Sequence, residues 1–399
     1  MSRKVGLGVD VLTAAEGRIS TIFDLCGKVY LSFSGGKDST VMLHLVAKEA
    51  RKRNRRFGLL LVDLEAQYAH TINHAIECFE MYSDVIDPYW VSLPLSLRNA
   101  VSQFEPQWLC FDPDRRDDWV RDPPAFAITD ESHFPFFRRG MEFEDFIEKF
   151  SEWYSGGALT ACFVGIRSDE SLNRFRTLVI DKQRLSGLQW TTRVSSGTYN
   201  AYPIYDWHTK DIWTYTHRTG LPMNPIYHLM HQAGVPLSHQ RICQPYGDDQ
   251  RRGLWLYHLL EPQTWGRVIK RVMGANSGAL YSQESGNING VGKVTKPSHL
   301  SWEQYAKLLL GSMPPATKDH YENKIAVFLK WYEDRGYPRG IPDDGKANDR
   351  DTPSWTRIVK ALLRNDYWCK GLSFSQHKSG AYAKYQKVMK ARRAKWGLI

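Results

Sequence analysis

The run Ser-Gly-Gly-Lys-Asp-Ser at residues 34–39 has the residue types and spacing of a phosphate-binding loop. It follows an apolar segment, residues 28–33, and precedes a helical pattern that begins near Asp38. Gly35 and Gly36 permit a tight turn that brings backbone N–H groups close to an oxyanion. The start of a helix adds unpaired N–H groups and a partial positive charge. We therefore predict a strand, a loop and a helix that together bind phosphate.

The side chains of this segment extend the same chemistry. Ser34, Ser39 and Thr40 supply hydroxyl donors, and Lys37 supplies a mobile cation. Asp38 is a candidate ligand for Mg²⁺, or a group that holds the loop closed. The spacing is too short for the GxxxxGK[ST] loop, so the segment represents a different class of phosphate-binding turn.

Polar residues also follow the next predicted strand, residues 57–62, at Asp63 and Glu65. In open α/β sheets ligands bind beyond the carboxyl ends of the strands, so these carboxylates are expected near the phosphate-binding loop. Asp63 is suited to a ribose hydroxyl or a metal ion. Glu65 is the weaker candidate, since a carboxylate at the start of a loop is often only a cap.

Two further polar segments follow predicted strands, residues 167–174 and residues 205–207. Arg167 and Arg174 can each bind an anion with two hydrogen bonds, while Asp169 and Glu170 can orient them or a metal ion. The alternative is a cluster of surface ion pairs. Placement at a strand end favours a role in binding.

A histidine-rich stretch ends in a cysteine: His228, His231, His239 and Cys243. Its spacing matches no familiar structural zinc site, so we interpret the histidines as hydrogen-bonding groups of a loop. Cys243 is a candidate nucleophile, because the neighbouring Arg241 could lower the pKa of its thiol. The alternative is that this cysteine is a small buried apolar residue.

The order of apolar segments predicts the fold. Strands are expected at residues 28–33, 57–62, 86–92, 161–166 and 200–205, and helices at 10–26, 38–54, 70–83, 142–154 and 209–219. This alternation indicates a doubly wound, mostly parallel α/β sheet. We predict a nucleotide-binding α/β domain at residues 1–273, a flexible Gly/Ser/Asn linker at 274–300, and a basic, mainly helical C-terminal domain at 301–399.

Charge is unevenly distributed along the 399 residues, whose net charge is +10. Residues 301–399 hold 19 Lys and Arg against 10 Asp and Glu, whereas residues 103–152 hold 13 acidic and 6 basic residues. The acidic segment, rich in proline and aromatic residues, is predicted to be an insertion on the rim of the sheet, partly a lid. In residues 382–396 bases alternate with aromatics, a pattern that suits tRNA or DNA. The alternatives are a solvated helix face or a surface that docks protein.

The cysteine pattern and hydropathy bear on location. The six cysteines are scattered without a CxxC pair, which argues against a disulfide framework and fits reduced thiols. No stretch of about 18 apolar residues is present, and residues 1–10 lack an apolar signal core. We therefore expect a cytoplasmic protein that does not cross a membrane.

Three segments resemble the phosphoadenosine phosphosulfate (PAPS) reductase family of PP-loop ATP pyrophosphatases: residues 29–39, 163–171 and 202–227. The first contains the S-G-G-x-D-S loop, and the third contains Pro-Ile-Tyr-Asp-Trp at 203–207. The region from Ser301 is similar to a poorly characterised branch with a helical C-terminal extension. The resemblance implies an adenine nucleotide alpha-hydrolase-like fold that binds ATP, PAPS or adenosine phosphosulfate (APS), and it extends to the small subunit of sulfate adenylyltransferase.

The sequence departs from that family where reduction is carried out. Sulfate-reducing members carry a catalytic cysteine in a C-terminal E-C-G-x-H segment and cluster-bearing members carry paired cysteines, and this chain has neither. No iron–sulfur cluster is therefore expected. The resemblance to adenylating members implies cleavage of ATP between the α and β phosphates, with release of pyrophosphate, on an unidentified acceptor.

The resemblance also assigns roles to the candidate residues. Residues 34–39 would bind the β and γ phosphates, with Lys37 and a Mg²⁺ ion at Asp38 offsetting the charge on the leaving pyrophosphate. Asp63 would contact the nucleoside. Arg167, Glu170 and Arg174 would bind the acceptor or the phosphates. The predicted catalytic residues are Lys37, Asp38 and Arg167.

Two other functions remain open from the sequence. One is a thiol-dependent PAPS or APS reductase that uses Cys243. The other is a nucleic-acid-binding regulatory protein that uses nucleotide as a switch, which the basic C-terminal region suggests.

Overall fold

The computed structural model describes residues 8–102, 105–179, 183–237, 239–247, 254–275, 296–313, 315–334, 337–344, 353–363, 366 and 369–372. The chain divides into two compact units, one of Met1–Leu97 and Gln107–Arg271, the other of Arg98–Pro106 and Val272–Ile399. Residues 276–295 of the predicted linker and all of residues 382–396 lie outside the described residues. The predicted linker and domain boundaries therefore stay predictions.

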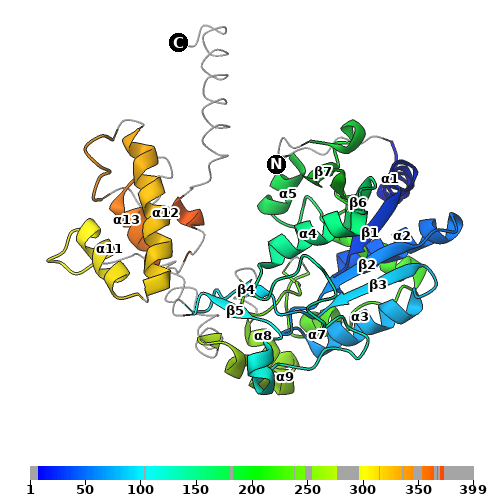
Figure 1. Ribbon diagram of the computed structural model, residues 1–399, viewed down its shortest axis with the longest axis horizontal. Coiled ribbons are helices and arrows are strands. Elements are labelled where there is room, and N and C mark those ends of the chain that lie inside the picture. The colour runs from blue at the N-terminus through cyan, green and yellow to red at the C-terminus, as the bar shows by residue number, and fades with distance from the viewer. Residues whose placement is uncertain are drawn as a thin grey trace, which may run out of the picture. The chain divides into compact units, whose positions relative to one another are not determined.

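The first unit is built on a six-stranded sheet with the strand order β3-β2-β1-β6-β8-β7 (Figure 1). The strands are β1 Lys28–Ser32, β2 Phe57–Val62, β3 Ile86–Val91, β6 Thr160–Val164, β7 Thr191–Ser195 and β8 Thr198–Ala201. All neighbours are parallel except β7, which runs antiparallel to β8. This topology confirms the predicted doubly wound, mostly parallel sheet, whereas strand β7 was not predicted.

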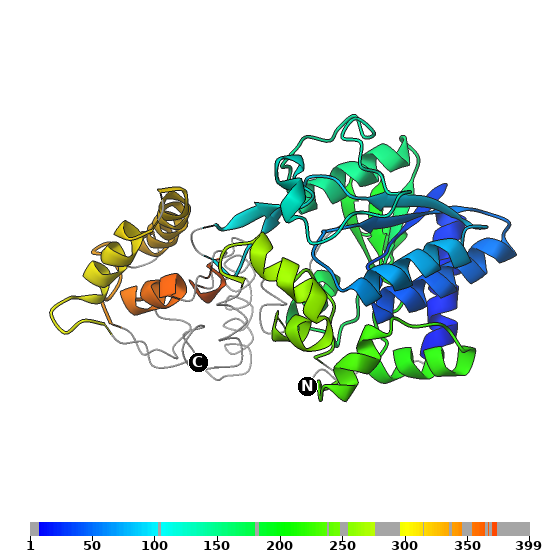
Figure 2. The same ribbon diagram turned by 90° about the horizontal axis from the view of Figure 1, so that it is seen from below.

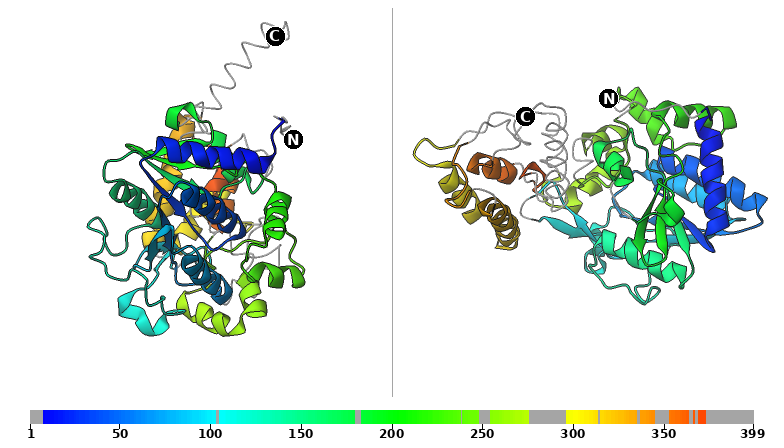
Figure 3. Two further views of the ribbon diagram at one scale, coloured as in Figure 1. Left: turned by 90° about the vertical axis from the view of Figure 1, so that its right-hand side faces the viewer. Right: turned by 90° about the horizontal axis from the view of Figure 1, so that it is seen from above.

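Helices cover both faces of this sheet. The helices described in this unit are α1 Val11–Leu25, α2 Lys37–Lys52, α3 Ala69–Met81, α4 Phe143–Ser155, α5 Leu172–Val179, α6 Thr209–Thr219, α7 Ile226–Gln232, α8 Leu254–Leu260 and α9 Pro262–Arg271. The first three lie side by side in Figure 3 (left, in blue). Val29 and Leu31 of β1 share a core with Ile22 of α1 and with α2, α3 and α6. The sequence had assigned no helix to the region of α7, α8 and α9.

Helix α4 covers the opposite face, to which Tyr30 of β1 points because side chains alternate along a strand. The Tyr30 ring lies 5.5 Å from that of Phe150 on α4. Tyr154, one turn further along α4, inserts its hydroxyl between two strands: it donates to Val29 O at 3.0 Å and accepts from Gly58 N at 3.0 Å. A Cβ on Gly58 would lie 2.9 Å from the Tyr154 ring, so only glycine leaves room there.

The predicted acidic insertion begins with a small hairpin of β4 (Ser96–Arg98) and β5 (Gln107–Leu109) and a 3₁₀ turn, Pro113–Asp118. It then runs along the outer edge of β3, where Val91 bridges to Ile128 and Ser92 N donates to Ile128 O at 2.9 Å. Covering an edge strand in this way removes unpaired backbone groups from solvent. The insertion therefore lies at the rim of the sheet, as expected.

The second unit is helical within the described residues, as predicted, with α11 Trp302–Gly311, α12 Pro315–Glu333 and α13 Trp355–Leu363 (Figure 2, yellow to orange). Ser301 caps α11 by accepting from Gln304 N at 3.1 Å, and the Gln304 side chain accepts from Ser301 N at 2.9 Å. Phe328, Ile358 and their neighbours form its own apolar core. None of the described helices is long and apolar enough to span a bilayer.

Candidate functional site

The loop between β1 and α2 has the geometry that its glycines predicted. Gly35 has a φ of +68°, a conformation that favours glycine. A Cβ on Gly35 would lie 3.0 Å from Thr71 Cγ2, and a Cβ on Gly36 would lie 3.3 Å from Tyr227 Oη. The turn therefore favours glycine at position 35, and close neighbours leave little room for a side chain at either position.

The two serines of the loop differ in burial and in their contacts. Ser39 is buried and its hydroxyl donates to Gly36 O at 3.0 Å, while Ser34 N donates to Ser39 Oγ at 3.3 Å. Ser34 is exposed, and its hydroxyl lies 3.1 Å from that of Ser39. Ser39 thus closes the loop, and Ser34 is available at its surface.

The three predicted catalytic residues lie together at the start of α2. Asp38 places one carboxylate oxygen 3.2 Å from Lys37 Nζ and the other 2.5 Å from Arg167 Nε. Lys37 and Arg167 are both buried. A Cβ on Gly165, at the end of β6, would lie 3.2 Å from Asp38 C, so β6 packs directly on the first turn of α2. Asp38 therefore holds two cations beside the loop.

A segment far along the chain lies against the same lysine. Lys37 Nζ donates to Gln240 O at 3.3 Å, and Arg241 donates to Glu170 O. A Cβ on Gly36 would lie 3.5 Å from Ile242 Cδ1. Residues 240–242 are therefore part of the wall of the candidate site.

Three supporting residues received no role from the sequence. Asn224 is buried and its Nδ2 donates to Gly35 O at 3.1 Å and to Thr71 Oγ1 at 2.9 Å. Lys37 N donates to Tyr227 Oη at 3.1 Å, and Arg167 Nη1 donates to Thr209 Oγ1 at 3.3 Å. All three lie in or near residues 202–227, which supported the family resemblance without individual functions. That resemblance was the signal that could have found them.

Thr40 was predicted to donate to phosphate, but its side chain is buried against α3. Its hydroxyl lies 3.0 Å from His74 Nε2. Burial lowers the pKa of His74 to about 4, so this imidazole is neutral near pH 7. Thr40 therefore holds α2 against α3.

Asp63 was predicted to contact the nucleoside, but its carboxylate is fully buried and already engaged. It accepts hydrogen bonds from Trp90 Nε1 at 3.0 Å and from Glu65 N at 3.0 Å, and it forms an ion pair with Arg121 of the insertion. The side chain thus orders the end of β2. This geometry argues against a ribose contact through the Asp63 carboxylate.

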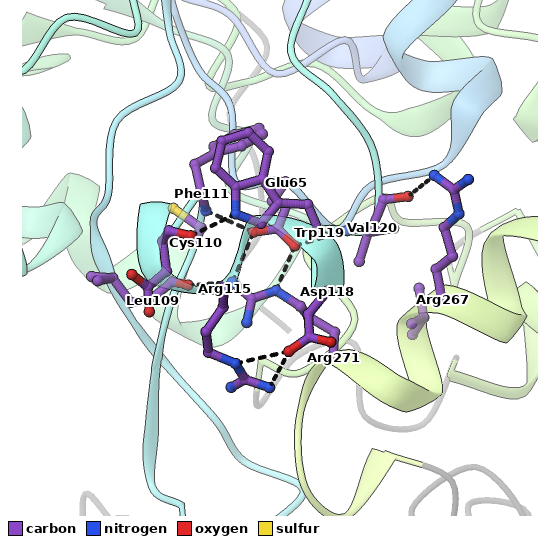
Figure 4. Close-up of polar contacts among 12 residues, drawn as sticks. Glu65, Leu109, Cys110, Phe111, Arg115, Asp118, Trp119, Val120, Arg267 and Arg271 are labelled. Carbon is purple, nitrogen blue, oxygen red and sulfur yellow. Dashed lines mark hydrogen bonds and ion pairs between the residues drawn. The ribbon is translucent and has the colours of Figure 1, made fainter.

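Glu65 is likewise fully buried, in an ion pair that Figure 4 shows. Arg271 of α9 donates to its two oxygens at 2.6 and 3.0 Å. Phe111 N at 2.6 Å and Val120 N at 3.0 Å donate to the same carboxylate. Glu65 therefore fastens the insertion and α9 to the end of β2, in keeping with a capping role.

The remaining predicted groups lie nearer the surface. Arg174 Nε is 3.7 Å from Glu170 Oε2, with 45% of the arginine side chain exposed, so this pair fits the alternative of a surface ion pair. Asp206 pairs with Arg18 of α1 at 2.7 Å, and Trp207 Nε1 donates to Val11 O at 3.0 Å. Asp206 and Trp207 therefore anchor α1.

The described residues offer no protein-built metal site. Nowhere in this part of the chain do three or more His, Cys, Asp or Glu side chains gather where they could bind an ion. Both oxygens of Asp38 face cations, so Asp38 does not fit the predicted role of a Mg²⁺ ligand. His228, His231 and His239 are exposed.

Cys243 differs from the other cysteines. The other five are buried, and burial raises the pKa of Cys26 to about 11 and that of Cys78 to about 12. Cys243 is half-buried and follows the segment that lines the loop. It is therefore the most accessible thiol of the six.

Comparison with known families divides the chain at residue 233. A model described as "Phosphoadenosine phosphosulfate reductase domain" matches residues 28–95 and 133–233. A model described as "Domain of unknown function (DUF3440)" matches residues 234–342. The uncharacterized protein YbdN of Escherichia coli (strain K12) is 46% identical over 400 residues, which cover 99% of this chain and 98% of YbdN.

Solved structures give more distant matches. PAPS reductase from Candida auris in a phosphate complex is 12% identical, with a TM-score of 0.31, over 57% of this chain and 94% of that one. Candida glabrata FMN adenylyltransferase in complex with ATP is 13% identical, with a TM-score of 0.33, over 56% and 62%. The U34-tRNA thiolase NcsA of Methanococcus maripaludis is 13% identical, with a TM-score of 0.32, over 75% and 88%. These values are too low to transfer an activity.

Proposed function

We propose that this chain, which belongs to the phosphoadenosine phosphosulfate reductase domain family and carries a DUF3440 region after that domain, cleaves ATP between its α and β phosphates. The adenylyl group would pass to an acceptor, and pyrophosphate would leave. The observation that carries this proposal is the Lys37–Asp38–Arg167 group at the strand–loop–helix junction. A buried cation at the N-terminus of a helix is an environment that stabilises polyphosphate.

The chemistry needs no covalent enzyme intermediate. An acceptor oxygen attacks the α phosphorus, the bond from that phosphorus to the bridging oxygen breaks, and the electron pair leaves with pyrophosphate. Lys37 and the positive end of α2 would offset charge on the leaving group, while Arg167 fixes Asp38 and thereby the lysine. Positioning and electrostatics of this kind can supply the rate enhancement. No step is assigned to a protein-bound metal, because Asp38 faces two cations.

The direct test is pyrophosphate release from ATP with candidate acceptors. We expect Lys37→Ala to lower the rate by about 100-fold or more, the usual cost of removing one preorganised group that stabilises developing charge. Lys48→Ala on the same helix is the matched control, since Lys48 is exposed and pairs with Glu16 at 2.8 Å. Unchanged release in Lys37→Ala and Asp38→Ala would exclude the loop from the reaction.

The half-buried Cys243 next to the loop wall favours one second candidate, a thiol-dependent PAPS or APS reductase. The thiolate would attack the sulfuryl sulfur, the sulfur–oxygen bond to the nucleotide would break, and an external dithiol would then release sulfite and become oxidised. Sulfite release with a reduced dithiol protein, abolished in Cys243→Ser and retained in the buried control Cys26→Ser, would support this activity.

Binding of tRNA or DNA was predicted from residues 382–396, which lie outside the described residues, so it stays a prediction. If the tail delivers tRNA or DNA to the adenylating site, the log of the affinity should fall linearly with the log of salt concentration. A chain that ends before residue 373 should then release pyrophosphate normally and lose this binding. A cytoplasmic location is also a proposal, and it rests on the cysteine pattern and hydropathy of the sequence.

A further inference from the structure

The hydroxyl of Tyr227 lies at the N-terminus of α2, beside the phosphate-binding loop. Lys37 N donates to Tyr227 Oη at 3.1 Å. The same oxygen would be 3.3 Å from a Cβ on Gly36, and the tyrosine is 4% exposed. A phenol from α7 thus occupies the position where the first backbone N–H of the 16-residue helix α2 points.

This phenol keeps a proton that has no acceptor within the part of the chain that the structure describes. A tyrosine hydroxyl that accepts one hydrogen bond can still donate another. The contact with Lys37 N uses only its acceptor capacity. Burial holds the pKa of Tyr227 well above its usual range, so the donor stays protonated. Buried donors are rarely left unpaired in proteins, and among the described residues this one is open to an acceptor that a bound ligand would supply.

The charged groups around the Tyr227 hydroxyl indicate which charge the acceptor carries. Lys37 Nζ lies 5.3 Å from the centre of the Tyr227 ring, and the positive end of α2 faces the same space. Asp38, the carboxylate of the loop, is engaged by Lys37 and Arg167. An anion that accepts hydrogen bonds fits this environment.

We infer that Tyr227 contacts the nucleotide, and that its O–H donates to a β or γ phosphoryl oxygen bound at residues 34–39. This inference rests on the proposed binding of ATP. It adds to the loop a donor from α7, so phosphate recognition is shared between two segments 190 residues apart.

The hydroxyl is held in place before any ligand binds. Asn224 ties the start of α7 to the loop, because its Nδ2 donates to Gly35 O and its Oδ1 accepts from Ile226 N at 3.1 Å. The ring of Trp213 meets that of Tyr227 edge to face at 5.8 Å. A donor fixed in this way loses little entropy when it binds phosphate.

The test compares full-length wild type with Tyr227→Phe, which removes the hydroxyl and keeps the ring. Affinities for ATP and AMP are measured by displacement of a fluorescent ATP analogue. We expect ATP affinity to fall by about tenfold, as for the loss of one hydrogen bond to a charged group, with AMP affinity unchanged. Tyr215→Phe is the matched control: Tyr215 is 8% exposed and its hydroxyl lies 2.9 Å from His44 Nδ1, away from the loop.

The outcomes separate this inference from the proposed function. Wild type that binds ATP while Tyr227→Phe binds it equally well would overturn the inference alone. An equal loss for ATP and AMP would assign the hydroxyl a general structural role and would also overturn it. Wild type that binds no adenine nucleotide would remove the proposed function, and the inference with it.

Discussion

At the scale of single residues, the loop itself was predictable and its supports were not. Glycines, hydroxyls and a lysine in a short run identify a phosphate-binding turn from local chemistry alone. The contact from Lys37 to Tyr227 joins residues 190 positions apart, and that from Asn224 to Gly35 joins residues 189 apart. Local pattern has no information on such pairs, because they depend on where α7 packs.

For the carboxylates at the strand ends, the sequence predicted a role in ligand binding that their contacts in the structure do not support. Asp63 and Glu65 appear in the sequence as polar residues at a ligand-binding edge. In the structure their charges are met by Arg121 and Arg271, which come from the insertion and from α9. A carboxylate at a strand end thus binds ligand only if no later segment of the chain supplies it with a partner.

A residue-scale prediction concerns His74, whose pKa is lowered to about 4 by burial. Because the folded state disfavours the charged imidazole, its contribution to stability is complete above pH 6.5 and is lost as the pH falls toward 4. Between these limits wild type should lose up to about 3 kcal/mol more unfolding free energy than His74→Gln. Urea denaturation across this pH range measures the difference, with the exposed His231→Gln as control. Parallel pH profiles for wild type and His74→Gln would contradict the prediction.

At the scale of elements, apolar runs predicted strands correctly, whereas a polar strand and short helices were missed. Residues 57–62 form β2 as predicted, since a continuous apolar run suits a strand covered on both faces. Strand β7 was missed because Thr191–Ser195 is polar and pairs only through the hairpin with β8. Helices α7 and α8 have seven residues each, too short for a helical period to stand out.

The ion pair between Glu65 and Arg271 leads to an element-scale prediction. Arg271→Met should leave a buried carboxylate without its cation and lower the free energy of unfolding by about 3–5 kcal/mol. Arg267→Met on the same helix should cost far less, because Arg267 is exposed and donates only to Val120 O at 3.2 Å (Figure 4). Chemical denaturation of both variants is the measurement. Equal small losses would show that α9 does not depend on this pair.

At the scale of the whole molecule, the family models and the compact units divide the chain at different places. The PAPS reductase model ends at residue 233, yet the first unit continues to Arg271. Glu261 caps α3 by accepting from Ala69 N at 2.8 Å and His70 N at 3.1 Å, and the Tyr257 ring stacks on that of Tyr68 at 3.8 Å. The first part of the DUF3440 region is therefore structurally part of the first unit.

This division predicts the outcome of truncation. A chain that ends at residue 233 lacks Glu261 and Arg271 and should fail to fold, whereas one that ends at residue 275 keeps both. The longer fragment also keeps Gly274, whose φ of +90° and close approach to Val101 O fix the start of the second unit. Circular dichroism and ATP binding of the two fragments test the boundary. A stable fragment that ends at residue 233 would contradict it.

The hydroxyl of Tyr154 between β1 and β2 makes the amide of Gly58 a probe of the contact between α4 and the sheet. The amide proton of Gly58 is held by a side chain from α4. Its exchange with deuterated solvent therefore requires α4 to lift from the sheet, while the flanking ladder amides require the strands to separate. The ratio of these exchange rates would measure how often α4 detaches without unfolding of the sheet beneath it.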